Sequence, residues 1–196
     1  MFKKLVVTGA TLALSTSVAF ASGTPYVGVS IGEATNTNNN TVVGTTSTTG
    51  TGNSFRGIPF IVNAGYGALL SQNLYLGAEV FGTIGTLSLN NSGVNGLKST
   101  YGYGASILPG IMLSEHTLTY VRLGVVRSHF TPSNTGAAKN TNYNINGGQL
   151  GLGMQFGLTQ NVDLRGEYVY TAYQSFAGLT KPKQDAFNLG LIYKFD

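Results

Sequence analysis

The sequence has no cysteine, no tryptophan and few charged residues, and these absences exclude whole classes of protein. Without cysteine, the chain has no disulfide framework, no thiolate metal site and no cysteine nucleophile. Charged residues make up 9% of the chain, against roughly 25% in an ordinary soluble domain. The formal charge of +4 falls to +2 when Lys3 and Lys4 are set aside. So small an excess does not point to a nucleic-acid partner.

Long apolar runs are also missing after the N-terminus. Residues 1–21 have the pattern of a secretory signal peptide, with two early lysines, an apolar stretch and Ala19-Phe20-Ala21 as a small-x-small cleavage site. Beyond them, no run approaches the ~18 apolar residues of a membrane-spanning helix. We therefore predict an exported chain whose mature domain is 22–196, and any membrane span in it must consist of strands.

A four-residue pattern recurs three times and sets the expected topology. Leu70-Ser71-Gln72-Asn73 returns as Leu113-Ser114-Glu115-His116 and as Leu158-Thr159-Gln160-Asn161. Each copy is a short polar break between two long alternating segments, which is typical of a tight hairpin turn. Longer stretches rich in Asn, Gly, Ser and Thr lie between the copies and towards both ends of the mature chain. We expect them to be loops at 35–54, 90–96, 131–142 and 177–183.

Three short turns alternating with four long loops predict eight strands. They fall near residues 25–34, 56–69, 74–88, 98–112, 117–130, 143–157, 162–176 and 184–195. Short turns at one end and long loops at the other predict an all-β fold, an eight-stranded antiparallel up-and-down transmembrane β-barrel. Pro59 and Pro109 fall inside strands, so we expect a strand end or a bulge at each, with Pro109-Gly110 as the better candidate for a bulge.

The charges of the predicted strands fall on one face. Counted from the last residue of each short turn, odd offsets are mostly apolar, as at Leu76, Leu123 and Leu164, whereas even offsets hold the charges. If the even face points inward, the odd face meets lipid. A soluble barrel with an apolar ligand pocket is the alternative. The scarcity of charge, the glycine-rich polar face and aromatic residues near strand ends favour the membrane.

Three motifs resemble those of the opacity-type surface antigens, whose fold is like the membrane domain of outer membrane protein A. They are Leu74-Tyr75-Leu76-Gly77-Ala78-Glu79, Tyr120-Val121-Arg122-Leu123-Gly124 and Val162-Asp163-Leu164-Arg165-Gly166-Glu167-Tyr168. The resemblance implies a barrel in the outer membrane of a Gram-negative bacterium. It would display loops to a host-cell ligand, as a surface antigen or adhesin, or serve as a structural component. The resemblance also implies that the assembly machinery recognises the C-terminal strand, although here Asp196 follows the terminal aromatic Phe195.

Four charged residues of the even face are expected to meet in the lumen. Glu79, Arg122 and Glu167 each stand six residues past their turn, and Arg165 lies just below them. An eight-stranded barrel is only wide enough to be filled by side chains, so these charges should pair. We predict a charge network that plugs the interior, and the alternative is a gate or proton path through a narrow channel.

Basic residues gather towards the predicted loop end. The acidic residues predicted at this end are Glu33 and Asp185. The basic residues are more numerous: Arg56, Lys98, Arg127, Lys139, Lys181 and Lys183. The outer leaflet is anionic, and arginine and lysine donate charge-assisted hydrogen bonds to phosphate. We expect this basic rim to contact lipopolysaccharide phosphates, although ordinary solubility would also account for it.

No catalytic, metal or cofactor site is expected. Some small barrels modify lipid A, and that chemistry needs a nucleophile beside a histidine at the outer leaflet. His129 and Ser133 are the nearest match, but their spacing does not resemble the His-x-Ser arrangement of the deacylase family, and an acidic orienting residue is missing. His116 lies in a turn at the opposite end. We therefore predict that the protein is not an enzyme, with an outer-leaflet lipid A-modifying enzyme kept as an alternative.

Overall fold

The protein is a closed β-barrel. The computed structural model describes residues 23–37, 54–85, 96–133, 143–174 and 183–195. The strands are β1 (Thr24–Thr37), β2 (Ser54–Gly57), β3 (Phe60–Leu69), β4 (Leu74–Ile84), β5 (Gly96–Ser114), β6 (Thr117–Ser133), β7 (Tyr143–Gly157), β8 (Val162–Tyr173) and β9 (Lys183–Lys194). All pairings are antiparallel, and β1 pairs with β9 to close the sheet. Within the described ranges, no helix has the length and apolarity to cross a membrane.

The nine labelled strands form the eight-stranded barrel that we predicted, because β2 and β3 are two parts of one strand that is interrupted at Pro59. The register against β1 is the same on both sides of the break, with Ala34 opposite Gly57 and Ile31 opposite Phe60. Proline has no amide proton for the ladder, but its carbonyl still accepts a hydrogen bond from the Gly32 amide at 3.1 Å. The strand end expected near Pro59 is therefore confirmed.

The bulge expected at Pro109-Gly110 is not there. Pro109 pairs with Leu76 of β4 inside a continuous β5. On the β6 side, pairing stops after Ile107–Leu123 and resumes at Gly110–Tyr120 without a change of register. The missing amide proton thus costs ladder pairing on one side but does not require an extra residue. The register shifts between β5 and β6 lie elsewhere, between Ser99 and Tyr101 and between Met112 and Ser114.

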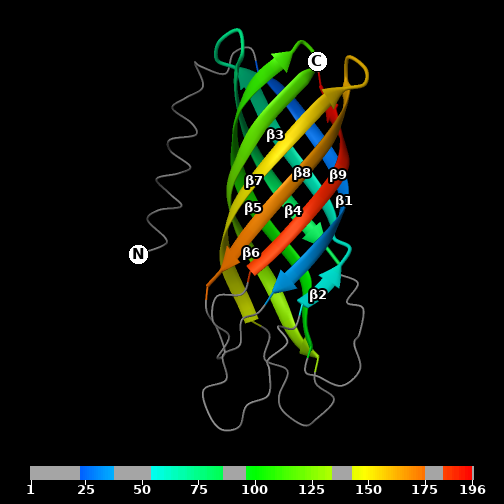
Figure 1. Ribbon diagram of the computed structural model, residues 1–196, viewed down its shortest axis with the longest axis vertical. Helices are drawn as coiled ribbons and strands as arrows, with labels where there is room; N and C mark the ends of the chain where they lie inside the picture. The colour runs from blue at the N-terminus through cyan, green and yellow to red at the C-terminus, as the bar shows by residue number, and fades with distance from the viewer. Residues whose placement is uncertain (1–22, 38–53, 86–95, 134–142, 175–182, 196) are drawn as a thin grey trace.

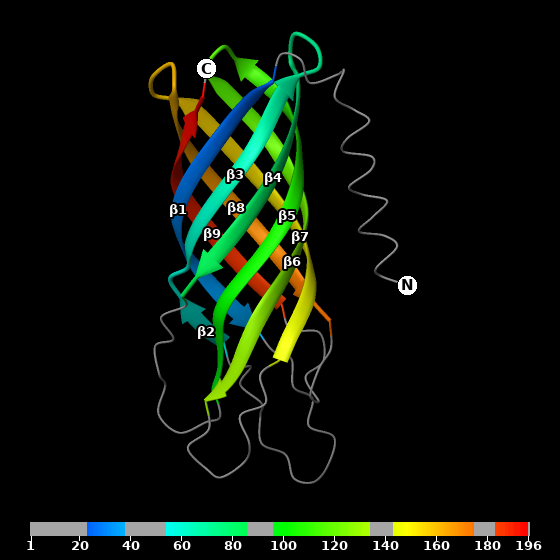
Figure 2. The ribbon, with the colours of Figure 1, turned by 180° about the vertical axis from the view of Figure 1, so that it is seen from behind.

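The strands are strongly tilted around the barrel axis (Figures 1 and 2). The tilt follows from the stagger with which the ladder closes. The stagger can be measured by starting at Tyr26 of β1 and moving to the directly opposite residue on each following strand. After one full circuit this path returns to β1 at Asn36, ten residues beyond its start. The path is Tyr26, Gly65, Glu79, Ser106, Gly124, Gln149, Thr171, Gln184 and Asn36.

The three repeated motifs form the three short turns, and they share a hydrogen-bonding role. The carbonyl of the fourth residue of each motif accepts an amide hydrogen bond from the next strand around the barrel. The donors are Met112 to Asn73, Gly157 to His116 and Lys194 to Asn161, each at 2.8 Å. In the third turn, the Thr159 hydroxyl also accepts from the Val162 amide at 3.0 Å. The sequence repeat is therefore a structural repeat that ties each turn to its neighbour.

The two faces of the sheet follow the predicted alternation. Apolar side chains such as Val80, Val125 and Leu152 stand exposed on the outer surface, whereas Glu79, Arg122 and Arg165 are buried inside. A soluble barrel with an apolar interior would show the opposite arrangement. An exposed apolar surface of this extent is what a bilayer covers.

Several strands run further towards the loop end than predicted. Residues 35–37, expected in a loop, pair with β9 through Asn36–Gln184 and Thr37–Lys183, and residues 131–133 belong to β6. Polar residues extend a sheet readily where backbone and side chains meet water rather than lipid. Most of the four expected loops, at 38–53, 90–95, 134–142 and 177–182, lie outside the described residues.

Candidate functional site

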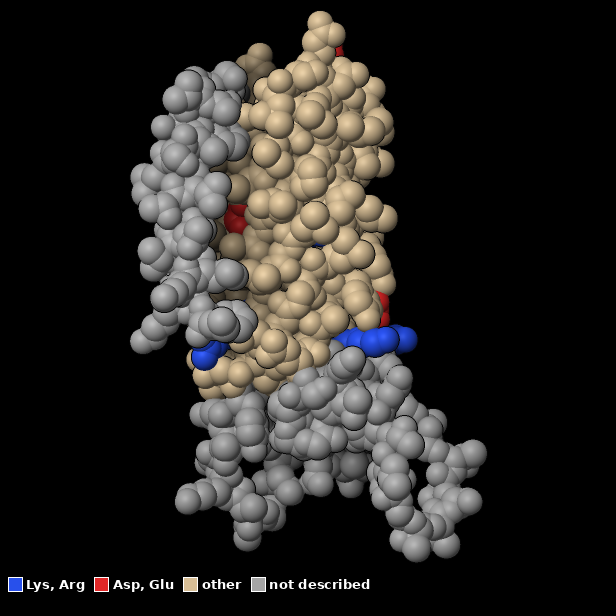
Figure 3. All heavy atoms as spheres, turned by 90° about the vertical axis from the view of Figure 1, so that its left-hand side faces the viewer, with Lys and Arg blue, Asp and Glu red and all other residues tan. Residues whose placement is uncertain are grey.

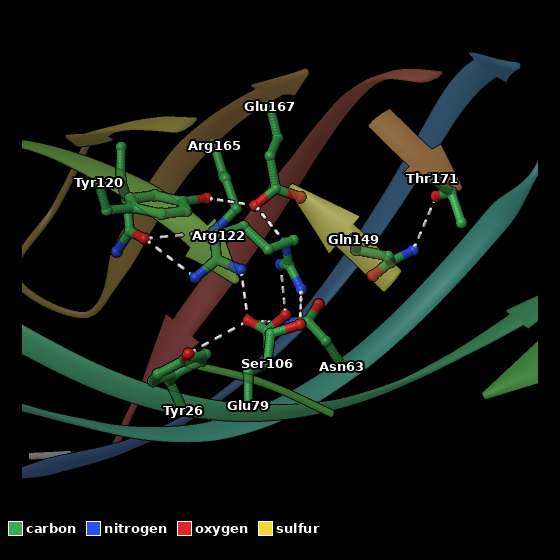
Figure 4. A network of polar contacts seen from close by, with 11 residues as sticks. Tyr26, Asn63, Glu79, Ser106, Tyr120, Arg122, Gln149, Arg165, Glu167 and Thr171 are labelled. Atoms are coloured by element: carbon green, nitrogen blue, oxygen red, sulfur yellow. Dashed lines mark hydrogen bonds and ion pairs between the residues drawn. The ribbon is translucent and has the colours of Figure 1, made fainter. Parts of the chain in front are cut away.

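A network of four charged side chains occupies the middle of the lumen (Figure 4). Glu79 of β4 is its centre, since its Oε1 lies 2.6 Å from Nη2 of Arg122 and its Oε2 lies 2.6 Å from Nη1 of Arg165. The Nε atom of Arg122 donates to Glu167 Oε1 at 2.9 Å. All four residues are at most 7% exposed. The structure thus brings together the four residues that we singled out from the sequence.

Uncharged side chains complete the hydrogen bonding of the network. Asn63 Nδ2 and the Tyr26 hydroxyl donate to Glu79 Oε2 at 2.8 and 3.1 Å. The Tyr120 hydroxyl donates to Glu167 Oε1 at 2.8 Å, and Arg122 Nη1 donates to the Ser106 hydroxyl at 2.9 Å. Sequence reasoning did not assign these four to the network. Their positions in the strand alternation put them on the inward face, and this was the sign in the sequence that could have identified them, because hydrogen-bond partners in a lumen must come from that face.

The network is electrically balanced. Two guanidinium groups meet two carboxylates, so no net charge is buried, which avoids the large penalty of an unpaired ion. Aromatic rings cover the cations. Arg122 Cζ lies 5.5 Å from the Phe81 ring centre, and Arg165 Cζ lies 5.4 Å from that of Tyr26. The ring faces are negative, so these contacts stabilise the guanidinium groups where water is excluded.

A polar chain connects the network to the turn end of the barrel. Arg165 donates to Gln155 Oε1 from Nε at 3.3 Å and from Nη2 at 3.1 Å. Gln155 in turn donates to Asp163, whose other oxygen lies 3.0 Å from Lys194 Nζ. Lys194 is partly exposed, so the charges become less buried towards this mouth.

Apolar clusters lie on both sides of the charges. Along β6, the inward residues run from Leu118 and Tyr120 through Arg122 to Val126. The turn-side cluster contains Leu108, Leu118 and Tyr120, with Tyr75 and Met112 packed against it. The loop-side cluster contains Phe81, Val126, Ile145 and Tyr173, with Ile61 packed against it. The charges are thus enclosed in a low-dielectric layer, where their mutual attraction is strong.

Inward-facing glycines make room for the tyrosine rings. A Cβ added at Gly153 would overlap the ring of Tyr120, and one added at Gly65 would overlap the ring of Tyr26. Both rings carry hydroxyls that bond the network. The abundance of glycine on the polar face therefore has a specific use, since it lets tyrosines lie flat across the narrow lumen.

Two cavities flank the network. The one on the loop side has a volume of about 70 Å³ and is lined by Glu79, Arg122 and Glu167 among others. The one at the turn-side mouth has a volume of about 970 Å³ and is lined by Tyr26, Gln155 and Asp163 among others. They share no lining residue. The network thus lies between these two cavities, because it lines the first and contacts Gln155 of the second through Arg165.

The basic rim is only partly within the described residues. Arg56 is exposed on β2 and lies 3.6 Å from the Glu33 carboxylate. Arg127 and Lys183 are exposed on β6 and β9. Lys98 is described as part of the β5 backbone alone. Lys139 and Lys181 lie outside the described residues. In Figure 3, Lys and Arg side chains lie near the loop-side end of the described barrel wall, which shows few charged residues elsewhere.

Neither histidine forms part of the network. His129 faces outward on β6, where Nδ1 lies 2.9 Å from Asn144 Oδ1 and its ring stacks on Tyr101. The Ser133 side chain lies outside the described residues. His116 is in the turn at the opposite end. Among the described residues, no group of His, Asp or Glu side chains is arranged to hold a metal ion.

Comparison with known proteins identifies the architecture. The family model for the outer membrane protein beta-barrel domain matches residues 6–195. The structure resembles Neisserial surface protein A, with a TM-score of 0.63 and 17% identity over 87% of this chain and 97% of that one. It also resembles Ail, the attachment invasion locus protein of Yersinia pestis, with a TM-score of 0.53 and 19% identity over 87% and 98%. Among curated proteins, none matches the chain.

Proposed function

The chain belongs to the outer membrane protein beta-barrel domain family, and from that premise we propose that it is a closed scaffold that displays loops at the cell surface as a surface antigen or adhesin. The family places the barrel in the bacterial outer membrane. The observation that carries the proposal is that the middle of the barrel interior is closed, while the turn end and the loop end of the barrel differ. Paired charges occupy the middle of the lumen, which favours the loop end over the interior as the surface for contact with other molecules.

The geometry of the barrel supports presentation of the loops. Every connection at the turn end is short, and each turn is tied to a neighbouring strand by a backbone hydrogen bond. At the other end, β5 and β6 extend to Gly96 and Ser133, past the last β4–β5 pair at Ile84–Tyr101. The ends of β5 and β6 therefore lie beyond the end of β4. Rigid scaffolds with variable loops are a common arrangement for recognition.

Binding to host cells tests the adhesin role. Bacteria that lack outer-membrane adhesins would express the full chain or a variant in which residues 38–53 are replaced by a short Gly-Ser linker. We expect the full chain to increase adherence to epithelial cells and the variant to lose that increase while reaching the membrane in equal amounts. Ail has been solved in complex with the heparin analogue sucrose octasulfate, so this polyanion is a suitable competitor. Equal adherence with and without the protein would refute the adhesin role and leave a structural one.

We propose that the charge network acts as a plug, so that the wild-type barrel does not conduct. The two cavities that it lies between do not share a wall residue, and its four charges are mutually satisfied. A solute-flux assay on purified protein in liposomes separates this role from a narrow channel. We expect the flux to equal that of protein-free vesicles, whereas size-limited flux would favour the channel.

We also propose that the basic rim binds phosphates of lipopolysaccharide. Exposed arginine and lysine side chains stand at the loop end of an otherwise charge-poor wall.

We further propose that the barrel assembly machinery recognises the closing strand β9. Next to the end of this strand, Phe195 and Tyr193 make an exposed aromatic pair with ring centres 5.0 Å apart. Phe195→Ala should lower insertion into the outer membrane more than Phe187→Ala does. Equal insertion of the two variants would refute this proposal.

A further inference from the structure

Two rows of outward-facing polar and aromatic side chains lie side by side on β5, β6 and β7 near the loop end. In one row Tyr101 is opposite His129, and His129 is opposite Asn144. In the next row Tyr103 is opposite Arg127, and Arg127 is opposite Asn146. We call these six residues the headgroup patch. All but the partly buried His129 are exposed, and directly opposite residues on a sheet bring their side chains into contact range.

The first row is held in a fixed arrangement. The rings of Tyr101 and His129 stack with centres 4.8 Å apart and planes 10° apart. His129 Nδ1 lies 2.9 Å from Asn144 Oδ1. Interfacial tyrosines alone would explain an aromatic girdle, but they would not explain a histidine and two asparagines directly beside them on β6 and β7. Stacked rings beside amides suit a ligand that has both flat apolar faces and hydroxyl groups, which is the chemistry of a sugar.

The second row supplies an anion-binding group. Arg127 is exposed, and no carboxylate within salt-bridge distance is found for it among the described residues. Arg56, at the same end of the barrel, lies 3.6 Å from Glu33. An arginine without a carboxylate partner is available for a phosphate, whose oxygens match the two-pronged guanidinium geometry.

A shallow depression of about 770 Å³ begins directly below the patch. The next outward residues towards the turn end, Ala105 and Ile107 on β5 and Leu123 and Val125 on β6, line it. Small side chains on the neighbouring strands, Ala64 of β3 and Ala78 of β4, leave space between the larger Tyr66 and Val80 that also line it. A groove on the lipid-facing wall with an apolar lining suits an acyl chain.

We infer that the headgroup patch and this groove together form a site for one outer-leaflet lipid with a phosphorylated sugar headgroup. The phosphate would lie on Arg127, the sugar on the tyrosines and asparagines, and an acyl chain in the groove. This inference deepens the proposed contact of the basic rim with lipopolysaccharide, because it rests on the loop end facing the outer leaflet. Instead of a general attraction between the basic rim and the lipid, it assigns the contact to one face of the barrel, formed by β5, β6 and β7.

Lipid retention measured by native mass spectrometry tests the inference. The mature protein would be reconstituted in phosphatidylcholine nanodiscs that contain lipid A with both phosphates, or dephosphorylated lipid A, and then released in detergent. We expect one phosphorylated lipid A molecule to stay bound per barrel and the dephosphorylated form to be lost. Arg127→Gln should lower retention about tenfold, since a charge-assisted contact is removed. The matched comparison Arg56→Gln removes the same charge from an arginine that pairs with Glu33 outside the headgroup patch, and it should lower retention much less than Arg127→Gln does.

A second variant tests the groove separately from the headgroup. Ala78→Phe fills the depression from β4, where Ala78 is opposite Ile107 and so lies four residues along the sheet from the Tyr103 row of the patch. It should also lower retention while urea unfolding shows an intact barrel. Equal losses for Arg127→Gln and Arg56→Gln would overturn the inference in favour of general charge attraction. Retention of the dephosphorylated lipid would overturn the phosphate contact at Arg127, and displacement by millimolar inorganic phosphate alone would overturn the lipid assignment. No host cell is involved, so failure of the adhesin role would leave these results unaffected.

Discussion

Replacing Arg122 by alanine should destabilise the barrel more than any exposed charge deletion. Its guanidinium binds Glu79 at 2.6 Å, Glu167 at 2.9 Å and the Ser106 hydroxyl at 2.9 Å, all in the buried lumen. After Arg122→Ala, Glu79 still has Arg165, but Glu167 is left with the Tyr120 hydroxyl as its described donor. Breaking a buried ion pair on one side typically costs about 3–5 kcal/mol, because the remaining charge is buried without compensation. Urea unfolding in micelles measures this cost.

The Arg56–Glu33 pair is the matched control for that measurement. Its side chains are 71% and 63% exposed and lie 3.6 Å apart, and such surface pairs contribute little. Arg122→Ala combined with Glu167→Gln should cost less than the sum of the two single changes, as coupled neighbours do. If Arg122→Ala and Arg56→Ala lower the free energy of unfolding equally, or if the double variant is additive, the buried network is not a coupled unit and the reasoning fails.

Three further predictions address the faces of the barrel and its processing. Leu123→Arg puts a charge on the lipid-facing wall and should cost about 2–4 kcal/mol of unfolding free energy in bilayers; stability equal to wild type would invert the inside–outside assignment. Gly153→Ala forces a methyl group against the Tyr120 ring and should cost about 1–3 kcal/mol, whereas Gly166→Ala, with open space around its Cβ, should change stability by under about 0.5 kcal/mol; equal effects would show that the ring is not confined. N-terminal sequencing of the outer-membrane form should begin at Ser22, and an intact N-terminus would refute cleavage.

The inward direction of the network residues could be predicted because strand periodicity is local. Once a turn ends at Asn73, His116 or Asn161, the parity of every following residue is fixed, so Glu79 and Arg122 had to share a face. The meeting of residues from β4, β6 and β8 also depends on the stagger with which the barrel closes. That stagger arises from all eight pairings together, and the equal offsets from the turns were only an indirect sign of it.

Other features could not be read from the sequence for identifiable physical reasons. Tyr26 and Asn63 join the network from strands without a preceding repeated turn, so no offset located them. Pro109 was expected to cause a bulge because it lacks an amide proton. In the structure its pairing with β4 continues and only the β6 side is interrupted, and the sequence does not say which neighbour a missing donor would have faced. The polar ends of β1 and β6 resemble loops in composition, yet they continue the ladders of their neighbours.

Single-channel recording in planar lipid bilayers tests the central claim most directly. A barrel whose lumen is closed by Glu79, Arg122, Arg165 and Glu167 should show no steady conductance as wild type, at any applied voltage that the bilayer tolerates. A steady current in proportion to voltage from the wild-type protein would contradict the account, because it would require a continuous water path through the layer that these side chains occupy.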